Sequence, residues 1–272
     1  MTAGALTAYR WELRKLVSQK RTYIGLGAAA LLPIIFVTVM GLQKGGPYDA
    51  PLGHNLRRTG LALALVVLNF VSRFGAQLAA ALVAGDIVAS EHTGNTLKLI
   101  LTRSLRRGQI LAGKTLASFT YVVATLVVLG IAGLVGGSIA WGFKPLTNLT
   151  GVQLSALHTL WLSAVALGLF ALPLIAVAAF AIMLSTWTRN SAAAIVGTLV
   201  YALGQEALAG LVHQSWAKDY LLSDQFDGWH GVFMSPVDWT LVARAAWVSA
   251  IFTAVPLAIA YVVFKRRDVA DD

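Results

Sequence analysis

Residues 108–115 read Gly-Gln-Ile-Leu-Ala-Gly-Lys-Thr and match the phosphate-binding pattern GxxxxGK[ST]. A working phosphate loop needs a buried strand before its glycines and the start of a helix after them, so that backbone N–H groups converge on the phosphates. Here a basic connection precedes the match, and about 26 mostly apolar residues follow it, enough to enter a bilayer. We therefore interpret Lys114 as a lipid-phosphate anchor at the mouth of a membrane span, and we expect the chain to be no ATPase.

Two opposite charges lie inside apolar segments. Arg73 is near the middle of one such segment, and a charge there costs roughly 3 kcal/mol on insertion scales, so it should face protein or a wet cavity. Glu206 lies deep in another segment and is the obvious opposite charge. We predict a translocation cavity lined in part by Asn69, Arg73, Gln77 and Glu206. The alternative is a purely structural Arg–Glu pair that stabilises the bundle.

Other residues of reactive type do not form a recognisable site. Histidines and aspartates in the second half could suggest a metal site, but their spacing matches no ligand pattern, and we expect solvated loop residues instead. Ser104 and the other serines have no paired base for nucleophilic catalysis. The chain has no cysteine, which excludes disulfides and thiolate sites. The histidines and aspartates are His158, His213, His230, Asp219, Asp224, Asp227 and Asp238.

The composition is that of an integral membrane protein. Of the 272 residues, 57% are hydrophobic and 12% charged, whereas soluble domains average about 45–50% apolar and about 25% charged residues. The net charge of +9 comes from basic residues beside apolar segments, where the positive-inside rule and anionic lipid headgroups place them. We therefore expect membrane lipids as partners and no nucleic acid.

Six apolar segments are long enough to cross a bilayer, which takes roughly 20 residues. They predict an all-α fold with one transmembrane domain over residues 1–272. The first segment lacks a small-residue cleavage site after it, so we expect an uncleaved span. The predicted spans are residues 23–42, 61–85, 110–141, 157–184, 191–212 and 242–264.

The connections between these segments differ in charge. Fourteen Lys and Arg residues fall on the side that holds both termini and the connection between the second and third spans, and five fall on the other side. The positive-inside rule therefore predicts cytoplasmic termini in a plasma (inner) membrane protein.

Two flanking segments are amphipathic. Before the first span, one helical face carries apolar side chains and another carries cations, which predicts a helix lying in the membrane surface; a snorkelling flank of the span is the alternative. The connection of residues 213–241 carries aromatic side chains that should return to the membrane interface. The apolar face comprises Leu6, Tyr9, Leu13, Leu16 and Val17, and the aromatic set Trp216, Phe226, Trp229, Phe233 and Trp239.

The basic stretch from residue 91 to residue 115 is best interpreted as a docking element. Ser90 or Thr93 can cap a short helix, and Gly94 allows close approach of another backbone. Leu97 lies on an apolar edge beside cations, as in a short amphipathic helix. Such a helix between two spans would let a soluble subunit push on the membrane part; the alternative is a solvated basic loop.

Residues 85–114 resemble the cytoplasmic loop of ABC-2 type permeases, the membrane subunits of one class of ATP-binding-cassette exporters. In that family an acid, a Gly-Thr-Leu run, a Ser-Arg-like turn and a terminal Gly-Lys recur between the second and third of six spans. The amphipathic N-terminus is similar to the family's connecting helix, and residues 264–268 to its usual ending. The residues that carry the likeness include Glu91, Gly94, Thr96, Leu97, Lys98, Arg103, Ser104, Gly113 and Lys114.

The resemblance implies a homodimer in which each copy engages a separate ATPase subunit, and that subunit binds ATP and Mg. Residues 91–103 would form the coupling helix, with Glu91, Gly94, Thr96, Leu97, Lys98 and Arg103 docking into the ATPase. The expected function is efflux of an amphiphilic or hydrophobic compound such as a drug, antibiotic or lipid. Two alternatives are a permease dedicated to maturation of an extracytoplasmic enzyme, and a membrane anchor or sensor for a soluble partner.

Overall fold

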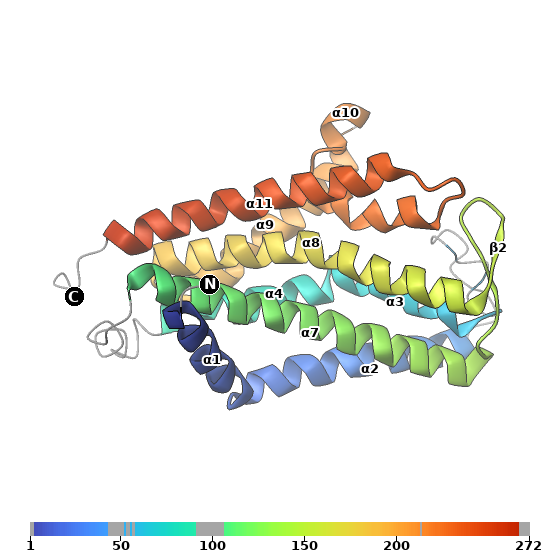
Figure 1. Cartoon of the computed structure of the whole chain (residues 1–272), viewed down its shortest axis with the longest axis horizontal. Helices are drawn as coiled ribbons and strands as arrows, with labels where there is room; N and C mark the ends of the chain where they lie inside the picture. Colours follow the sequence, from blue (N-terminus) through green and yellow to red (C-terminus); the bar gives the residue numbers. More distant parts are fainter. Residues whose placement is uncertain are drawn as a thin grey trace.

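A computed structural model describes residues 3–42, 52, 55, 58–90, 106–212 and 214–266, which form an elongated bundle of helices (Figure 1). A two-stranded antiparallel hairpin of β1 (Leu146–Thr147) and β2 (Gln153–Leu154) caps one end, the hairpin end. The start of α7 and the end of α11 lie together at the opposite end, the α1 end. The helices are α1 (Ala3–Val17), α2 (Lys20–Leu42), α3 (Gly60–Arg73), α4 (Gly75–Asp86), α7 (Arg107–Trp141), α8 (Ala156–Thr188), α9 (Ser191–Leu211), α10 (Ser215–Lys218), the 3-10 helix η2 (Ser223–Phe233) and α11 (Trp239–Arg266).

In the described residues, five helices are long and apolar enough to cross a membrane: α2, α7, α8, α9 and α11. The pair α3 and α4 passes the same test together and makes a sixth segment, bent by 48°. The chain is therefore an all-α membrane protein, as its sequence predicts. The bend falls at Phe74, whose φ of −124° and ψ of −63° depart from helical values and place Arg73 at the end of α3.

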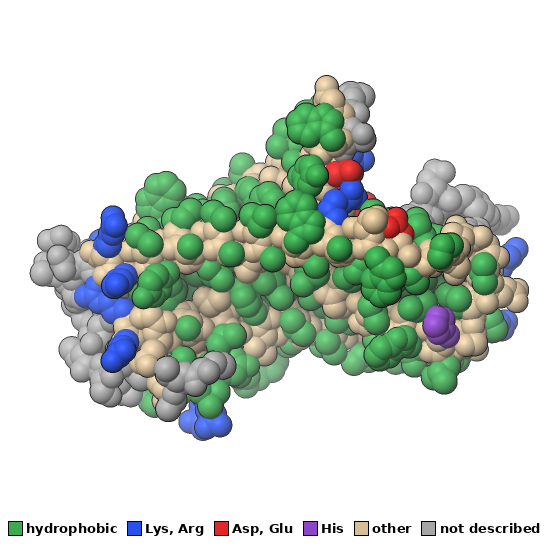
Figure 2. All heavy atoms as spheres, turned by 45° about the horizontal axis from the view of Figure 1, so that its top comes forward, with side chains coloured by type: hydrophobic (Ala, Val, Ile, Leu, Met, Phe, Trp, Pro, Cys, Tyr) green, Lys and Arg blue, Asp and Glu red, His purple; other side chains and the backbone are tan. Residues whose placement is uncertain are grey.

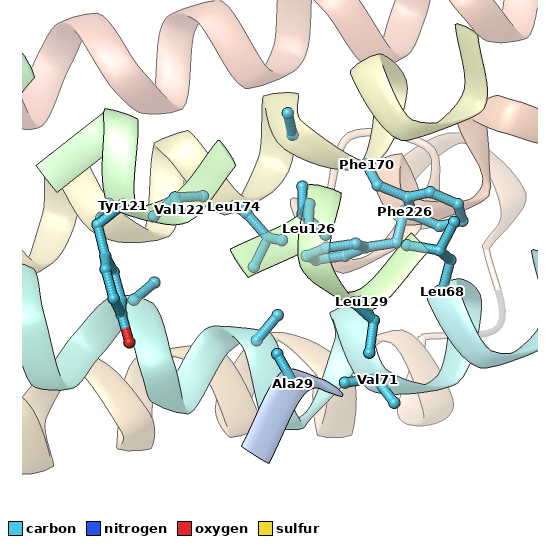
Figure 3. Close-up of a cluster of buried hydrophobic side chains, with 14 of the residues drawn as sticks. Ala29, Leu68, Val71, Tyr121, Val122, Leu126, Leu129, Phe170, Leu174 and Phe226 are labelled. Atoms are coloured by element: carbon cyan, nitrogen blue, oxygen red, sulfur yellow. The ribbon is translucent and has the colours of Figure 1, made fainter. Parts of the chain in front are cut away.

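α8 is the central helix of the bundle. Of its most apolar stretch 67% is buried inside the protein, against 17% for α2 and for α9. Phe170 and Leu174 of α8 are fully buried and pack in one cluster with Leu126 of α7 (Figure 3). Side-chain caps define where two helices start: Ser155 accepts a hydrogen bond from the His158 amide before α8, and Asn190 from the Ala193 amide before α9.

Small residues bring α3 and α7 into backbone contact. A Cβ added to Gly60 would lie 2.2 Å from the carbonyl carbon of Gly137, and one added to Gly133 would lie 3.1 Å from the Cα of Ala64. The Gly60 amide also donates to the Gly142 carbonyl at 2.9 Å. Close approach through small residues is how membrane helices gain packing energy without a hydrophobic driving force.

The aromatic connection after α9 enters the bundle instead of resting at the membrane interface. Phe226, Trp229 and Phe233 of η2 are no more than 1% exposed, and Trp229 packs on Phe170 of α8 with ring centroids 5.9 Å apart. Their spacing of three and four residues puts them on one face, which the core covers. The interface prediction was therefore wrong for these three side chains, whereas Trp216 and Trp239 are exposed.

α1 packs against the bundle through a face that only partly coincides with the predicted apolar one: Leu16 is buried in the core, and Tyr9 and Leu13 pack against it. The buried side chains of α1 also include Ala8 and Glu12, while Leu6 and Val17 of the predicted face remain exposed. A Cβ on Gly113 of α7 would lie 2.6 Å from the Cβ of Ala8, so this glycine is what lets the two helices touch.

Candidate functional site

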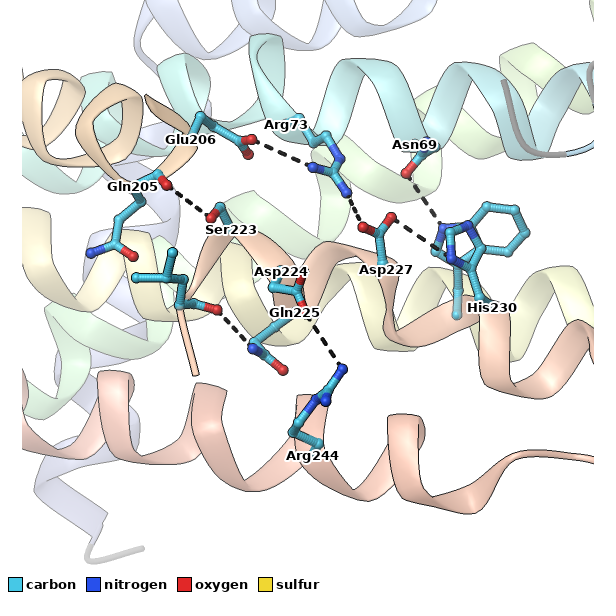
Figure 4. A network of polar contacts seen from close by, with 12 residues as sticks. Asn69, Arg73, Gln205, Glu206, Ser223, Asp224, Gln225, Asp227, His230 and Arg244 are labelled. Atoms are coloured by element: carbon cyan, nitrogen blue, oxygen red, sulfur yellow. Dashed lines mark hydrogen bonds and ion pairs between the residues drawn. The ribbon is translucent and has the colours of Figure 1, made fainter. Parts of the chain in front are cut away.

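Arg73 is the centre of a polar network inside the bundle (Figure 4). Its Nη2 lies 2.6 Å from Oδ2 of Asp227 on η2, and its Nη1 lies 3.4 Å from Oε2 of Glu206 on α9. The bend at Phe74 places the guanidinium between these two elements. The structure thus brings together the two charges that the sequence suggested as a pair, and it adds a second carboxylate that sequence reasoning missed.

Asn69 and His230 extend this network along η2. Trp229 donates from Nε1 to Oδ1 of Asn69 at 3.4 Å, and His230 Nδ1 lies 3.9 Å from Oδ1 of Asp227 (Figure 4). Burial lowers the pKa of His230, Asp227 opposes that shift, and Arg73 adds to it. A neutral imidazole is thus favoured beside the Arg73 pair.

A second arginine holds the start of η2. Arg244 of α11 lies 2.7 Å from Oδ2 of Asp219 through Nη1 and 3.4 Å from Oδ2 of Asp224 through Nη2. Burial, with the charge of Asp227, raises the pKa of Asp224, and Arg244 opposes that shift. The expectation of solvated acids was wrong for Asp224, whose side chain is 14% exposed, because η2 folds into the bundle.

The remaining predicted cavity residue, Gln77, lies one helical turn beyond Arg73 on α4. It is buried beside Tyr201, Gln205 and Leu222. One sequence signal pointed to the aspartates of the connection after α9. Arg244 is a cation near the start of an apolar segment, and such a charge needs an acidic partner.

A second polar cluster lies at the α1 end, where Lys114 is completely buried. Its Nζ donates to Oε1 of Glu12 on α1 at 2.7 Å and to the carbonyl of Ile87 at 3.1 Å. The prediction that Lys114 snorkels to lipid phosphates was therefore wrong. Gly113 lets α1 approach α7, and Glu12 then supplies a closer anion than a headgroup could.

The phosphate-loop match itself lies inside a helix. Residues 108–115 belong to the first turns of α7, so most of their N–H groups bond along the helix instead of converging on a loop ligand. Phosphate binding by this sequence pattern needs a loop, whereas residues 108–115 are helical.

The four residues after α4 are tied to the surrounding helices. The amides of Val88 and Ala89 donate to Oγ of Ser185 on α8 at 3.3 and 3.0 Å, and Arg21 of α2 pairs with Asp86 through Nη1 and Oδ2. This set of contacts, together with Glu12 and Lys114, is called the junction below. The predicted docking residues Glu91, Gly94, Thr96, Leu97, Lys98 and Arg103 lie outside the described residues.

In the described part of the chain, no three His, Asp or Glu side chains come together as metal ligands do. His213, one of the histidines considered from the sequence, lies outside that part.

Comparison with known proteins gives one family. A family model described as "Protein of unknown function (DUF2705)" matches residues 31–270. No curated protein matches the chain.

Proposed function

The chain belongs to the DUF2705 family, and from this premise we propose that it is the membrane subunit of an ABC-2 type exporter. The observation that carries the proposal is the junction: Lys114 links α1, the residues after α4 and the start of α7 through two hydrogen bonds. Residues 91–103, whose sequence resembles the coupling helix of ABC-2 type permeases, directly follow in sequence the residues that the junction holds. A partner that moves this segment would therefore act on three helices at once.

The charge distribution supports a cytoplasmic α1 end. On the face drawn in Figure 2, most Lys and Arg side chains gather at that end, and apolar side chains cover the middle of the bundle. By the positive-inside rule, this end faces the cytoplasm, where ATP and an ATPase subunit are available. Both termini and the coupling segment would then share that side in the plasma (inner) membrane.

A push at the junction has a physical path to the Arg73 network. α4 runs from Gly75 to Asp86, so one continuous helix connects the bend beside Arg73 with the junction. Arg73 ends α3 directly before the bend at Phe74, so a tilt of α4 about this bend would displace Arg73 relative to Glu206 on α9 and Asp227 on η2. Such a rigid-body movement is a known way to switch a transport cavity between two openings.

The proposed cargo is an amphiphilic or hydrophobic compound moved by a homodimer of this chain. The exposed surfaces of α2 and α9 are rich in apolar side chains, whereas Arg73 and Lys114 are paired with carboxylates inside the bundle. ATP and Mg would be bound by a separate ATPase subunit, and the site residues of this chain would act by docking that subunit and lining the cavity.

Co-purification from native membranes tests the proposal. We expect the chain to hold a soluble ATPase with phosphate-loop and signature motifs, and Glu91→Ala or Gly94→Leu to lower transport-coupled ATP hydrolysis while membrane insertion is retained. Lys144→Gln, at the hairpin end, is the matched control and should leave coupling unchanged. A chain that purifies alone, or coupling that survives both substitutions, would contradict the assignment.

A further inference from the structure

A lateral groove of about 340 Å³ opens between α2, α4 and α7. Its floor comprises Ala29, Val71 and Leu129, which belong to the buried cluster in Figure 3. Ile24 and Leu82 line its rim and are 71% and 44% exposed. The volume falls within the range of small-ligand pockets, roughly 300–1,000 Å³.

Small side chains create the groove. Gly25 and Ala28 line it on α2, and Ala79 lines it on α4, so neither helix fills the space between them. A Cβ on Gly25 would lie 2.0 Å from the Tyr121 hydroxyl, which shows that this phenol reaches the backbone of α2. The groove thus has a concave shape that no side chain of the described residues occupies.

The groove is polar at one end only. Arg21 of α2 lies there, and the hydroxyl of Tyr121 on α7 reaches α2 at Gly25, about one helical turn from Arg21. Nearly all other lining residues are apolar, and the Thr125 hydroxyl donates to the Tyr121 carbonyl of its own helix. Arg21 bonds to Asp86 through Nη1 and to Gln19 through Nε at 2.9 Å. A guanidinium has five N–H donors, so these two bonds leave capacity for a further anion.

The length of the groove is close to the hydrocarbon thickness of one bilayer leaflet. It runs along α2 from Arg21 to Leu32, which at 1.5 Å per residue is about 17 Å. Half of a hydrocarbon core of roughly 30 Å is about 15 Å. With Arg21 at the headgroup level of the α1 end, the apolar part of the groove ends near the bilayer midplane.

We propose that this groove binds one acyl chain of an anionic glycerophospholipid from the leaflet at the α1 end, with the lipid phosphate at Arg21. A second copy of this chain is a poorer fit. Its surface would have to supply both an anionic side chain at Arg21 and a single narrow apolar ridge that fills the groove over the depth of one leaflet. The inference requires the membrane placement of the helices, and it does not depend on the exporter function.

Photolabelling tests the site directly. The full-length chain is placed in nanodiscs of phosphatidylcholine that contain a small fraction of phosphatidylglycerol with a diazirine in its acyl chain. After irradiation, mass spectrometry of peptides should locate adducts on α2 and α4 at the groove. Ala28→Phe fills the groove and should abolish these adducts. Gly27→Phe, its neighbour with open space around an added Cβ, should retain them.

Headgroup recognition is tested by a charge substitution. Arg21→Gln should lower labelling by phosphatidylglycerol about fivefold, which is the loss of binding expected when one cation near an anionic headgroup is removed. Labelling by a phosphatidylcholine probe should change little. Arg14→Gln removes the same charge from an exposed position on α1 and should have no effect at the groove. Because Arg21 also pairs with Asp86, Ala28→Phe, which keeps that pair, is the deciding variant.

Three results would overturn the site. They are groove labelling that is equal in wild type and Ala28→Phe, equal labelling by the two headgroups, and disulfide formation between two copies through Ala28→Cys with no lipid adduct. The last result would assign the groove to a second copy. The chain has no native cysteine, so that disulfide could form only at the introduced position.

Discussion

At the scale of single residues, buried charges decide how this chain is held together. Lys114 has no exposed surface, and its partner Glu12 is 9% exposed. Removing water from two ions costs several kcal/mol each, which their attraction and added hydrogen bonds must offset. The Ile87 carbonyl supplies one such bond at 3.1 Å. The pair therefore fixes the position of α1 more than it adds net stability.

Lys114→Met should destabilise the protein by about 3–5 kcal/mol, because it leaves Glu12 buried without its cation. The double variant Glu12→Leu with Lys114→Met should recover most of that loss, since both charges are then gone. Thermal unfolding in detergent measures both. Lys144→Met, at an exposed position, is the control and should behave as wild type. Additive effects of the two junction substitutions would contradict the pairing.

Acidification should weaken the packing of η2 through His230. Burial holds its folded-state pKa below the usual value of 6.5, so below that pH the unfolded chain takes up a proton that the folded chain does not. Stability should therefore fall as the pH drops below about 6.5 and level off below the folded-state pKa. Asp227 and Arg73 face the ring and set the size of this effect.

The measurement is the unfolding temperature between pH 7.5 and pH 5 for wild type and His230→Gln. Between these two pH values, the unfolding temperature of His230→Gln should fall by less than that of the wild type. Asp224, whose raised pKa acts in the opposite sense, is present in both proteins and cancels in the comparison. Equal pH profiles would show that His230 does not titrate on unfolding in this range.

Residue-level prediction from the sequence had a clear limit. Arg73 and Glu206 stood out because charges within apolar runs need partners. Asp227 did not, because it lies in a connection whose acids look solvated until η2 is known to enter the bundle. Lys114 was predicted to contact lipid phosphate because its true partner was also hidden from the sequence. α1 approaches α7 at Gly113 through a tertiary contact that no local sequence pattern encodes.

At the scale of elements, hydrophobic length predicted the spans and small residues explain their packing. Each of the six apolar segments corresponds to a helix or to the bent pair, because roughly 20 apolar residues have few other stable states in lipid. The break at Phe74 was missed, since the segment is apolar on both sides of it and Gly75 alone does not require a bend.

Gly137→Leu should separate α3 from α7. An added Cβ would lie 2.5 Å from the Gly60 carbonyl oxygen, a backbone atom that cannot move aside alone. We expect a loss of about 1–3 kcal/mol or more, as for other overpacked cores. Gly136→Leu is the matched control, because its Cβ would meet only Val37 Cγ2 at 3.5 Å. Equal unfolding temperatures for the two variants would contradict this packing.

At the scale of the whole molecule, two polar clusters stand at different levels of one bundle. The junction gathers α1, α2, α7, α8 and the residues after α4, whereas the Arg73 network gathers α3, α9 and η2. α4 connects the two levels. Under the proposed function, energy from ATP would enter at residues 91–103, and a tilt of α4 would carry the movement to the network.

Cysteine labelling in the chain's cysteine-free background tests that movement. Single cysteines are placed at Phe74, which is 48% exposed beside Arg73, and at Gly204 on α9, where an added Cβ meets nothing within 4 Å. If the Arg73 network lines a cavity that changes its opening, maleimide labelling at both positions should differ between the nucleotide-free complex and the complex trapped with ATP and vanadate. Lys144→Cys, exposed at the hairpin end, should label equally in both states. Unchanged labelling at Phe74 and Gly204, with the ATPase subunit shown to be trapped, would mean that the network is a fixed structural pair and that transport follows another route.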